Sequence, residues 1–187
     1  MKIAAGVSNR HIFLSEADTL TLFQTLDVPR RGRLGQDSYY TYEPTVDIVG
    51  EKYTLKNVRV IGPPRPTTQV ELLYGDCIKL GIEPVVRHSA DIKGSAGGVL
   101  KSEWGQVRLQ EGFIVAARHI HANPFEASKR GLYDGQIVSV RSGGVRGLVF
   151  HNVLVRVEEK AVWALHIDLE EGNAAGLKNK ELCDIIL

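Results

Sequence analysis

The chain has 187 residues, of which 43% are hydrophobic, so it is long enough to bury the core of one domain or of two small ones. Its 23 lysine and arginine residues nearly balance its 22 acidic residues, which gives no electrostatic reason to expect a nucleic-acid partner or an anionic membrane. No apolar run approaches about 18 residues, and the two cysteines lie far apart, so we expect a cytoplasmic protein that does not span a membrane.

Most of the chain is predicted to form short β-strands, because β-branched residues alternate with polar ones. Four short helices are expected in the stretches "SEADTLTLFQTL", "YGDCIKLGI", "NPFEASKRGL" and "LEEGNAAGL", with Ser15 and Asn123 as N-caps and Pro124 in a first turn. Residues 84–111 contain several glycines and predict a loop followed by a hairpin. The expected strands cover residues 45–49, 55–62, 69–73, 106–110, 113–121, 136–142, 152–159 and 161–169.

The two halves of the chain repeat the same order of elements. "RHIF", a short helix, "TVDIVG", "LKNVRVIG" and "QVELLYGDCIKLGI" in the first half correspond to "RHIH", a short helix, "QIVSVRSG", "FHNVLVRV" and "ALHIDLEEGNAAGL" in the second. When Gly81 is aligned with Gly176, Glu71 falls on His166 without a gap. A repeat of this length indicates two copies of one small folding unit.

We therefore predict a mainly β fold, with two similar small β-barrels that carry short capping helices. Barrel closure is favoured because it removes unpaired sheet edges. The first barrel is assigned to residues 1–84, a loop-and-hairpin connection to 85–111, and the second barrel to 112–187.

A pair of histidines in "AARHIHANP" indicates metal binding. His119 and His121 lie two apart in an expected strand, so they project from the same face and could chelate a zinc-sized ion. Glu71 or His166, at matching places in the repeats, could supply a third ligand and leave a position open for substrate. The alternative is two ordinary strand histidines, one buried and hydrogen-bonded and the other exposed.

Arg65 is a candidate oxyanion-binding residue. It lies in "GPPRPTTQVE", where prolines stiffen a turn six residues before Glu71. A guanidinium is a planar fork that matches phosphate or carboxylate, so Arg65 could hold such a group beside a metal. A surface arginine in a rigid turn fits the sequence equally well.

Over almost its whole length the chain resembles the PduL-type phosphotransacylases, which are phosphate propanoyltransferases associated with bacterial microcompartments. The resemblance implies two β-barrel domains and a two-metal site, usually zinc. The implied reaction converts an acyl-CoA, propanoyl or acetyl, and phosphate into acyl phosphate and free coenzyme A. We expect the transfer to be direct, because neither Cys77 nor Cys183 lies in a motif with a histidine base. The matching stretches are "GVSNRH", "NVRVIGP", "TQVE", "EGFIVAARHIH", "DGQIVSVR", "RGLVFHNVLVRV" and "LHIDLEEGNAAGLKN".

The resemblance also implies roles for single residues. Glu71, His119 and His121 match the ligands of one metal, while His11 and His166 match ligands of the other. Arg65 matches the phosphate-binding arginine. The residues that match the lining of a coenzyme A channel are Gly6, Val7, Ser8, Arg59 and Asn173.

Phe13 departs from the pattern, because it stands where a third histidine ligand is expected. The second ion is therefore predicted to be weakened, lost, or completed by water or another side chain such as His88. Phe13 also motivates an alternative function, a catalytically weakened paralogue that binds coenzyme A or acts as a structural microcompartment protein.

The segment "PRRGRLGQDSYYTYEP", residues 29–44, also departs from the family pattern. Arg30, Arg31 and Arg33 could meet the phosphates of coenzyme A, although a solvated basic loop is the preferred interpretation. The first barrel is expected to begin almost at Met1, which leaves no N-terminal extension for encapsulation. Microcompartment shell or enzyme partners, encapsulation and an oligomer are left open.

Overall fold

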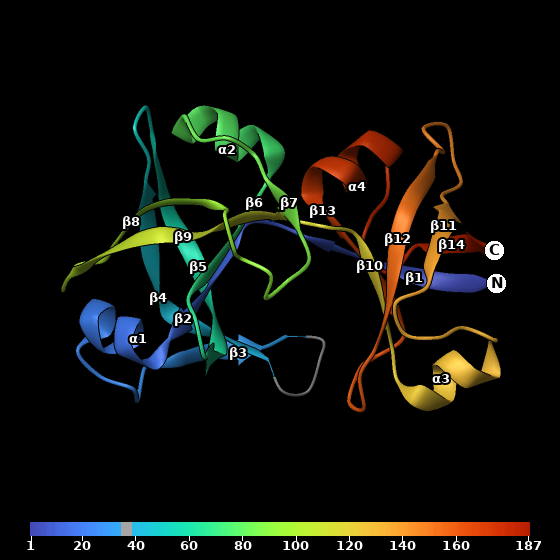
Figure 1. Ribbon diagram of the computed structural model, residues 1–187, viewed down its shortest axis with the longest axis horizontal. Coiled ribbons are helices and arrows are strands. Elements are labelled where there is room, and N and C mark those ends of the chain that lie inside the picture. The colour runs from blue at the N-terminus through green and yellow to red at the C-terminus, as the bar shows by residue number, and fades with distance from the viewer. Residues whose placement is uncertain (35–38) are drawn as a thin grey trace. The chain divides into compact units, whose positions relative to one another are not determined.

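The computed structural model describes residues 1–34 and 39–187, and most of its regular structure is β-strand, as predicted (Figure 1). Contacts divide the chain into two units. The terminal unit consists of Met1–Asn9 and Ala117–Leu187, and the central unit consists of Arg10–Ala116. Among the described residues, no helix has both the length and the apolar character needed to cross a bilayer.

The terminal unit is a closed barrel with the strand order β1-β13-β10-β12-β11-β14 (Figure 1). β1 and β14 lie near the two chain ends and pair antiparallel with each other, which closes the ring. Apolar side chains such as Ile120 and Leu165 are fully buried in its core. The strands are β1 (Lys2–Ser8), β10 (His119–Ala122), β11 (Ile137–Arg141), β12 (Val149–Val157), β13 (Ala164–Asp168) and β14 (Leu182–Ile186).

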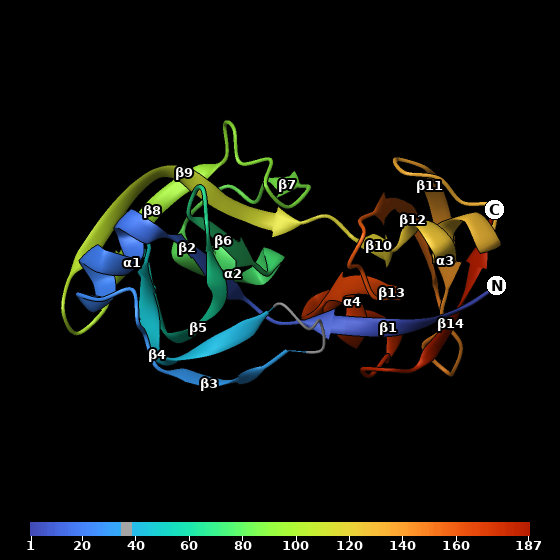
Figure 2. The same cartoon turned by 90° about the horizontal axis from the view of Figure 1, so that it is seen from below.

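The central unit contains a second ring, which closes because β8 pairs with both β4 and β9 (Figure 2). Its order is β4-β5-β2-β6-β9-β8, while β3 (Arg30–Arg33) pairs with β4 and β7 (Val86–Arg87) pairs with β9. The ring strands are β2 (His11–Ser15), β4 (Tyr40–Val49), β5 (Thr54–Arg65), β6 (Gln69–Leu72), β8 (Ala96–Lys101) and β9 (Gln106–Ala116).

Each unit carries two short helices. The Ser15 hydroxyl accepts a hydrogen bond from the Asp18 N–H at the start of α1 (Glu16–Phe23), and Asn123 caps α3 (Pro124–Lys129) in the same way, as predicted. The other two helices, α2 (Tyr74–Leu80) and α4 (Leu169–Ala175), each follow the strand that carries a predicted ligand.

The predicted repeat is present in the strand pairing. Every neighbouring pair in one ring has a counterpart of the same orientation in the other; for example, β2 runs parallel to β5 as β10 does to β12. Gly81 and Gly176 both end a helix in the left-handed conformation, at φ 79° and 66°. Asn57 and Asn152 are also equivalent, with φ of 57° and 56°.

The strand that precedes each repeat along the chain pairs with the strands of the other repeat. β1 was assigned from the sequence to the first barrel, but it pairs with β13 and β14 of the terminal unit. β9 precedes the second repeat, and it pairs with β6 and β8 of the central unit. The chain therefore crosses between units after Asn9 and after Ala116, and the second crossing interrupts the strand expected over 113–121.

Candidate active site

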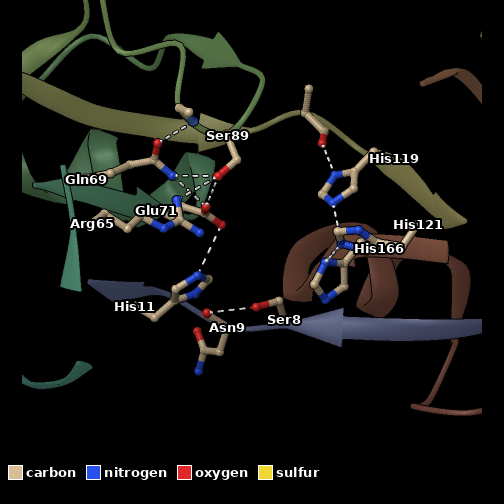
Figure 3. A network of polar contacts seen from close by, with 12 residues as sticks. Ser8, Asn9, His11, Arg65, Gln69, Glu71, Ser89, His119, His121 and His166 are labelled. Atoms are coloured by element: carbon tan, nitrogen blue, oxygen red, sulfur yellow. Dashed lines mark hydrogen bonds and ion pairs between the residues drawn. The ribbon is translucent and has the colours of Figure 1, made fainter. Parts of the chain in front are cut away.

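Three histidines of the terminal unit converge (Figure 3). The Nε2 atoms of His119 and His121 lie 2.9 Å apart, and the Nε2 of His121 lies 3.3 Å from the Nδ1 of His166. The antiparallel register of β10 and β13 places His119 opposite His166, and the two-residue period of a strand brings His121 to the same face. All three candidate ligand atoms lie within 4.8 Å of one another.

The chemistry of this cluster fits a zinc-class ion. Zinc binds imidazole nitrogens at about 2.0 to 2.1 Å, so two ligands in a tetrahedral site lie about 3.3 to 3.4 Å apart. The Nδ1 of His119 lies 2.9 Å from the carbonyl oxygen of Ala117. Because a carbonyl can only accept, this nitrogen carries the proton, and the lone pair of neutral His119 lies on Nε2, which faces the other imidazoles.

Gly6 gives the ring of His166 the space it occupies. β1 runs parallel to β13, with Gly6 beside His166 in the register. A Cβ at position 6 would lie 3.1 Å from the Cδ2 of His166 and 3.3 Å from the carbonyl oxygen of Leu165. A larger residue would therefore press on a candidate metal ligand, a reason for glycine that the sequence alone did not reveal.

Four of the five residues assigned to coenzyme A from the sequence belong to the terminal unit. Gly6, Val7 and Ser8 follow one another on β1, and α4, which carries Asn173, packs against that strand. The approach is close, because a Cβ on Gly172 of α4 would lie 2.8 Å from a methyl carbon of Val7.

The fifth of these residues, Arg59, lies on β5 of the central unit. Burial lowers the pKa of Arg59, and the nearby carboxylate of Glu71 acts in the opposite direction. The carboxylate of Glu71 therefore partly offsets the effect of burial on the pKa of Arg59.

His11 and Glu71 face each other in the central unit (Figure 3). The Nε2 of His11 lies 3.2 Å from one oxygen of Glu71. The other oxygen accepts hydrogen bonds from the Nε2 of Gln69 at 2.7 Å and from the Ser89 hydroxyl at 3.2 Å. The Nη1 of Arg65 donates to the same hydroxyl at 3.0 Å, so Ser89 connects the predicted phosphate-binding residue to Glu71.

Within the terminal unit His166 joins His119 and His121, and it is one of the two third ligands that the sequence left open. Within the central unit Glu71 contacts His11. The register explains both contacts, because each repeat pairs its first histidine with the ligand position of its own following strand. The two metal groupings that the family resemblance implies join residues of both units and stay predictions.

Phe13 occupies the position where a third ligand was expected, and its ring contacts the side chains of Arg65 and His11. The Cζ of Arg65 lies 3.2 Å from the centroid of the Phe13 ring, and the His11 ring meets that ring edge-on with centroids 5.0 Å apart. His88 is exposed, and its neighbour Ser89 contacts Glu71 instead. Within the described part of the central unit, His88 does not join His11 and Glu71 in a metal-sized cluster.

Twin ion pairs anchor the arginine that precedes the first histidine of each repeat. Arg10 binds Asp76 through two hydrogen bonds of 2.5 and 2.8 Å, and the Nε of Arg118 lies 2.8 Å from a carboxylate oxygen of Glu171. Both acids lie five residues before the glycine that ends the helix, so the repeat alignment could have revealed them. Burial raises the pKa of Glu171, although Arg118 and the Asp168 N–H oppose this shift.

The basic segment expected as a solvated loop contains a solvated strand, β3. Arg30, Arg31 and Arg33 are all exposed on it, and the guanidinium of Arg30 lies 3.9 Å from the ring centroid of Tyr40. Residues 35–38 of this segment lie outside the described residues.

Comparison with known proteins identifies a family that this chain matches. Residues 4–178 match the family model described as phosphate propanoyltransferase. A phosphate propanoyltransferase of Rhodopseudomonas palustris is 43% identical over 185 residues, which covers 98% of this chain and 82% of that protein. Those of Shewanella putrefaciens and Salmonella typhimurium are each 43% identical over 178 residues, with 94% and 95% of this chain and 83% and 85% of the relatives covered.

Proposed function

The chain belongs to the phosphate propanoyltransferase family, and from this membership we propose that it transfers an acyl group, propanoyl or acetyl, between coenzyme A and inorganic phosphate. The observation that carries the proposal is the convergence of three imidazoles, those of His119, His121 and His166, in a chain that matches the family over residues 4–178. This cluster has the donors that a catalytic metal needs.

We propose that the three histidines hold one zinc-class ion. When bound, such an ion would supply Lewis-acid stabilisation of the negative charge on a thioester oxygen or a departing thiolate, and neutral imidazole ligands would leave its charge undiminished. The hydrogen bond from His119 to the carbonyl of Ala117 keeps the His119 ring in the required tautomer and orientation.

Arg65 is proposed to bind phosphate and to direct one of its oxygens at the thioester carbonyl carbon. The new bond joins that oxygen to the carbon, the carbon–sulfur bond breaks, and coenzyme A leaves as the thiolate. Positioning two reactants in this way lowers the entropic part of the barrier. The hydrogen bond from Arg65 to Ser89 supports this role, because it limits the rotation of the guanidinium.

Direct transfer is proposed in place of a covalent acyl-enzyme. Cys77 and Cys183 are both buried, and burial raises the pKa of the Cys183 thiol, which disfavours the reactive thiolate.

The residues proposed to contact coenzyme A are Gly6, Val7, Ser8, Asn173 and Arg59. A cytoplasmic location is proposed from the cysteine usage of the sequence. Association with a microcompartment and with its shell or enzyme partners is proposed from the family resemblance.

The test is thiol release from propanoyl-CoA, measured with and without phosphate and with and without a chelator. We expect release to require phosphate, to be lost after chelation, and to fall about a hundredfold in Arg65→Ala. Arg141→Ala, which removes an exposed arginine of β11, should retain activity. Coenzyme A binding without turnover would favour the alternative of a weakened paralogue, and phosphate-independent release would favour a hydrolase.

A further inference from the structure

Ala117 and Arg118 form a short stretch between the point where the chain enters the terminal unit and His119, which begins β10. The Nδ1 of His119 lies 2.9 Å from the carbonyl oxygen of Ala117, so the ring takes its tautomer and orientation in part from the backbone of this stretch. One backbone hydrogen bond of the stretch, from the Leu154 N–H to the Arg118 carbonyl, is 3.4 Å long and therefore weak. A firm hold on this stretch has to come from elsewhere.

Glu171 anchors the side chain of Arg118. The Nε of Arg118 lies 2.8 Å from one carboxylate oxygen of Glu171, and the exposed fractions of the two side chains are 35% and 20%. The other oxygen of Glu171 accepts a hydrogen bond of 3.1 Å from the Asp168 N–H. Hydrogen bonds to charged groups are stronger than those between neutral groups, so this contact restricts the movement of Arg118.

The carboxylate of Glu171 thereby connects the two strands that carry the cluster. Asp168 ends β13, two residues after His166, and Arg118 directly precedes His119 on β10. Glu171 therefore joins the end of β13 to the start of β10, where the register places His119 opposite His166. The Glu171 N–H also donates to the Asp168 side chain at 2.7 Å, which fixes the carboxylate at the start of α4.

The same arrangement occurs in the central unit. Asp76 binds the guanidinium of Arg10 and accepts a hydrogen bond of 3.2 Å from the Leu73 N–H at the start of α2. In both repeats the anchored arginine directly precedes the first histidine. The contact is therefore a feature of the repeated unit and not a chance pair on the surface.

We propose that Glu171 is a positioning residue of the three-histidine cluster. By anchoring Arg118, it holds the Ala117 carbonyl that keeps the lone pair of His119 on Nε2, facing the other two imidazoles. The proposal rests on the proposed metal site for the identity of the bound ion. The alternative is that Glu171 acts only through the helix cap that it forms with Asp168, which would stabilise α4 without affecting His119.

The first measurement is the zinc affinity of the full chain, by competition with a chromophoric chelator. Arg118→Ala leaves the helix cap intact, whereas Glu171→Ala removes the cap and the ion pair. Each variant should bind zinc about 10- to 100-fold more weakly than the wild type, the usual effect of losing a group that orients a metal ligand. The double variant should bind about as tightly as Glu171→Ala, because both substitutions remove the same contact. Glu171→Gln keeps an oxygen acceptor and should lose less affinity than Glu171→Ala.

Glu126→Ala is the matched control. Glu126 pairs with Arg130 in the same unit, and its side chain is 23% exposed, close to the value for Glu171. This control should keep the zinc affinity of the wild type. Thermal melting of the metal-free variants would show that each of them folds, and Arg118→Ala carries the test if Glu171→Ala does not fold.

The second measurement needs no metal. Proton–nitrogen NMR correlation spectra of the chelator-treated protein at about pH 8, where an ordinary imidazole is neutral, report which nitrogen of His119 carries the proton. We expect the proton on Nδ1 in the wild type and in Glu126→Ala, and a mixture of both tautomers in Glu171→Ala and Arg118→Ala. Loss of the helix cap alone would leave this signal unchanged.

Wild-type zinc affinity in folded Arg118→Ala would overturn the proposal, and so would an unchanged His119 tautomer in folded Arg118→Ala or Glu171→Ala. Failure of the proposed metal site would give a different result, because zinc binding would then survive His121→Ala. The tautomer measurement would still decide in that case whether Glu171 holds His119.

Discussion

Gly6→Ala perturbs the candidate metal ligands from outside the cluster. The new Cβ would lie 3.1 Å from the Cδ2 of His166, whereas carbon atoms in favourable contact are about 3.5 Å apart or more, so the ring or β1 must move by about 0.4 Å. A metal site holds its ligand distances within about 0.2 Å. The Nδ1 of His166 lies 3.3 Å from the Nε2 of His121, a spacing that suits zinc as it stands. We therefore expect the zinc affinity to fall about 10- to 100-fold while the barrel still folds.

The affinity would be measured by competition with a chromophoric chelator, and folding by circular dichroism and thermal melting. Gly143→Ala is the matched control in the same unit, because a Cβ there would meet no atom within 4 Å. The control should keep the affinity of the wild type. The reasoning is refuted if Gly6→Ala folds normally and binds zinc as tightly as the wild type, because the ring of His166 would then not depend on the space at position 6.

Three further predictions concern stability. Asp76→Ala removes the partner of the partly buried Arg10 and should lower the free energy of unfolding in urea by about 1 to 3 kcal/mol. An equal loss when Asp76→Ala is made in an Arg10→Ala background would show that the two residues are not coupled, which would contradict this prediction. Burial raises the pKa of Glu171 above its ordinary value of 4.5, so the folded state holds this proton to higher pH than the unfolded chain does. The contribution of protonated Glu171 to the free energy of unfolding is therefore lost as pH rises from the ordinary pKa through the raised pKa. Glu171→Gln should therefore gain stability relative to the wild type in urea titrations as pH rises from 4 to 7, and a constant difference would contradict this. Asn57→Ala should cost about 1 kcal/mol in thermal or urea unfolding because φ is 57°, whereas Asn57→Gly should cost less; the reverse order would refute the backbone explanation.

The internal repeat could be recognised from the sequence because short local features occur in both halves of the chain. The αL glycines Gly81 and Gly176 end equivalent helices, and aligning them brought Glu71 and His166 to the same place. The register of the strands agrees, since these two residues face His11 and His119 respectively. Two closed barrels could therefore be predicted from the repeat, together with the expectation that closure removes unpaired sheet edges.

Pairing between distant segments could not be predicted in this way. Nothing local in β1 indicates that it pairs with β13, more than 150 residues away, and the exchange of β1 and β9 between the units depends on such contacts. Strand pairing also places His119 opposite His166 and His11 opposite Glu71. Ser89 was missed because a lone serine in a loop carries no periodic signal, although its hydroxyl contacts Arg65, Gln69 and Glu71.

X-ray absorption at the zinc edge of the loaded protein tests the central claim most directly. The account predicts three imidazole nitrogens at about 2.0 to 2.1 Å and one exchangeable oxygen ligand from water, with a spectrum that is unchanged in His11→Ala and lost in His121→Ala. A spectrum that requires a protein carboxylate, or one that changes in His11→Ala, would contradict the assignment of the metal to His119, His121 and His166.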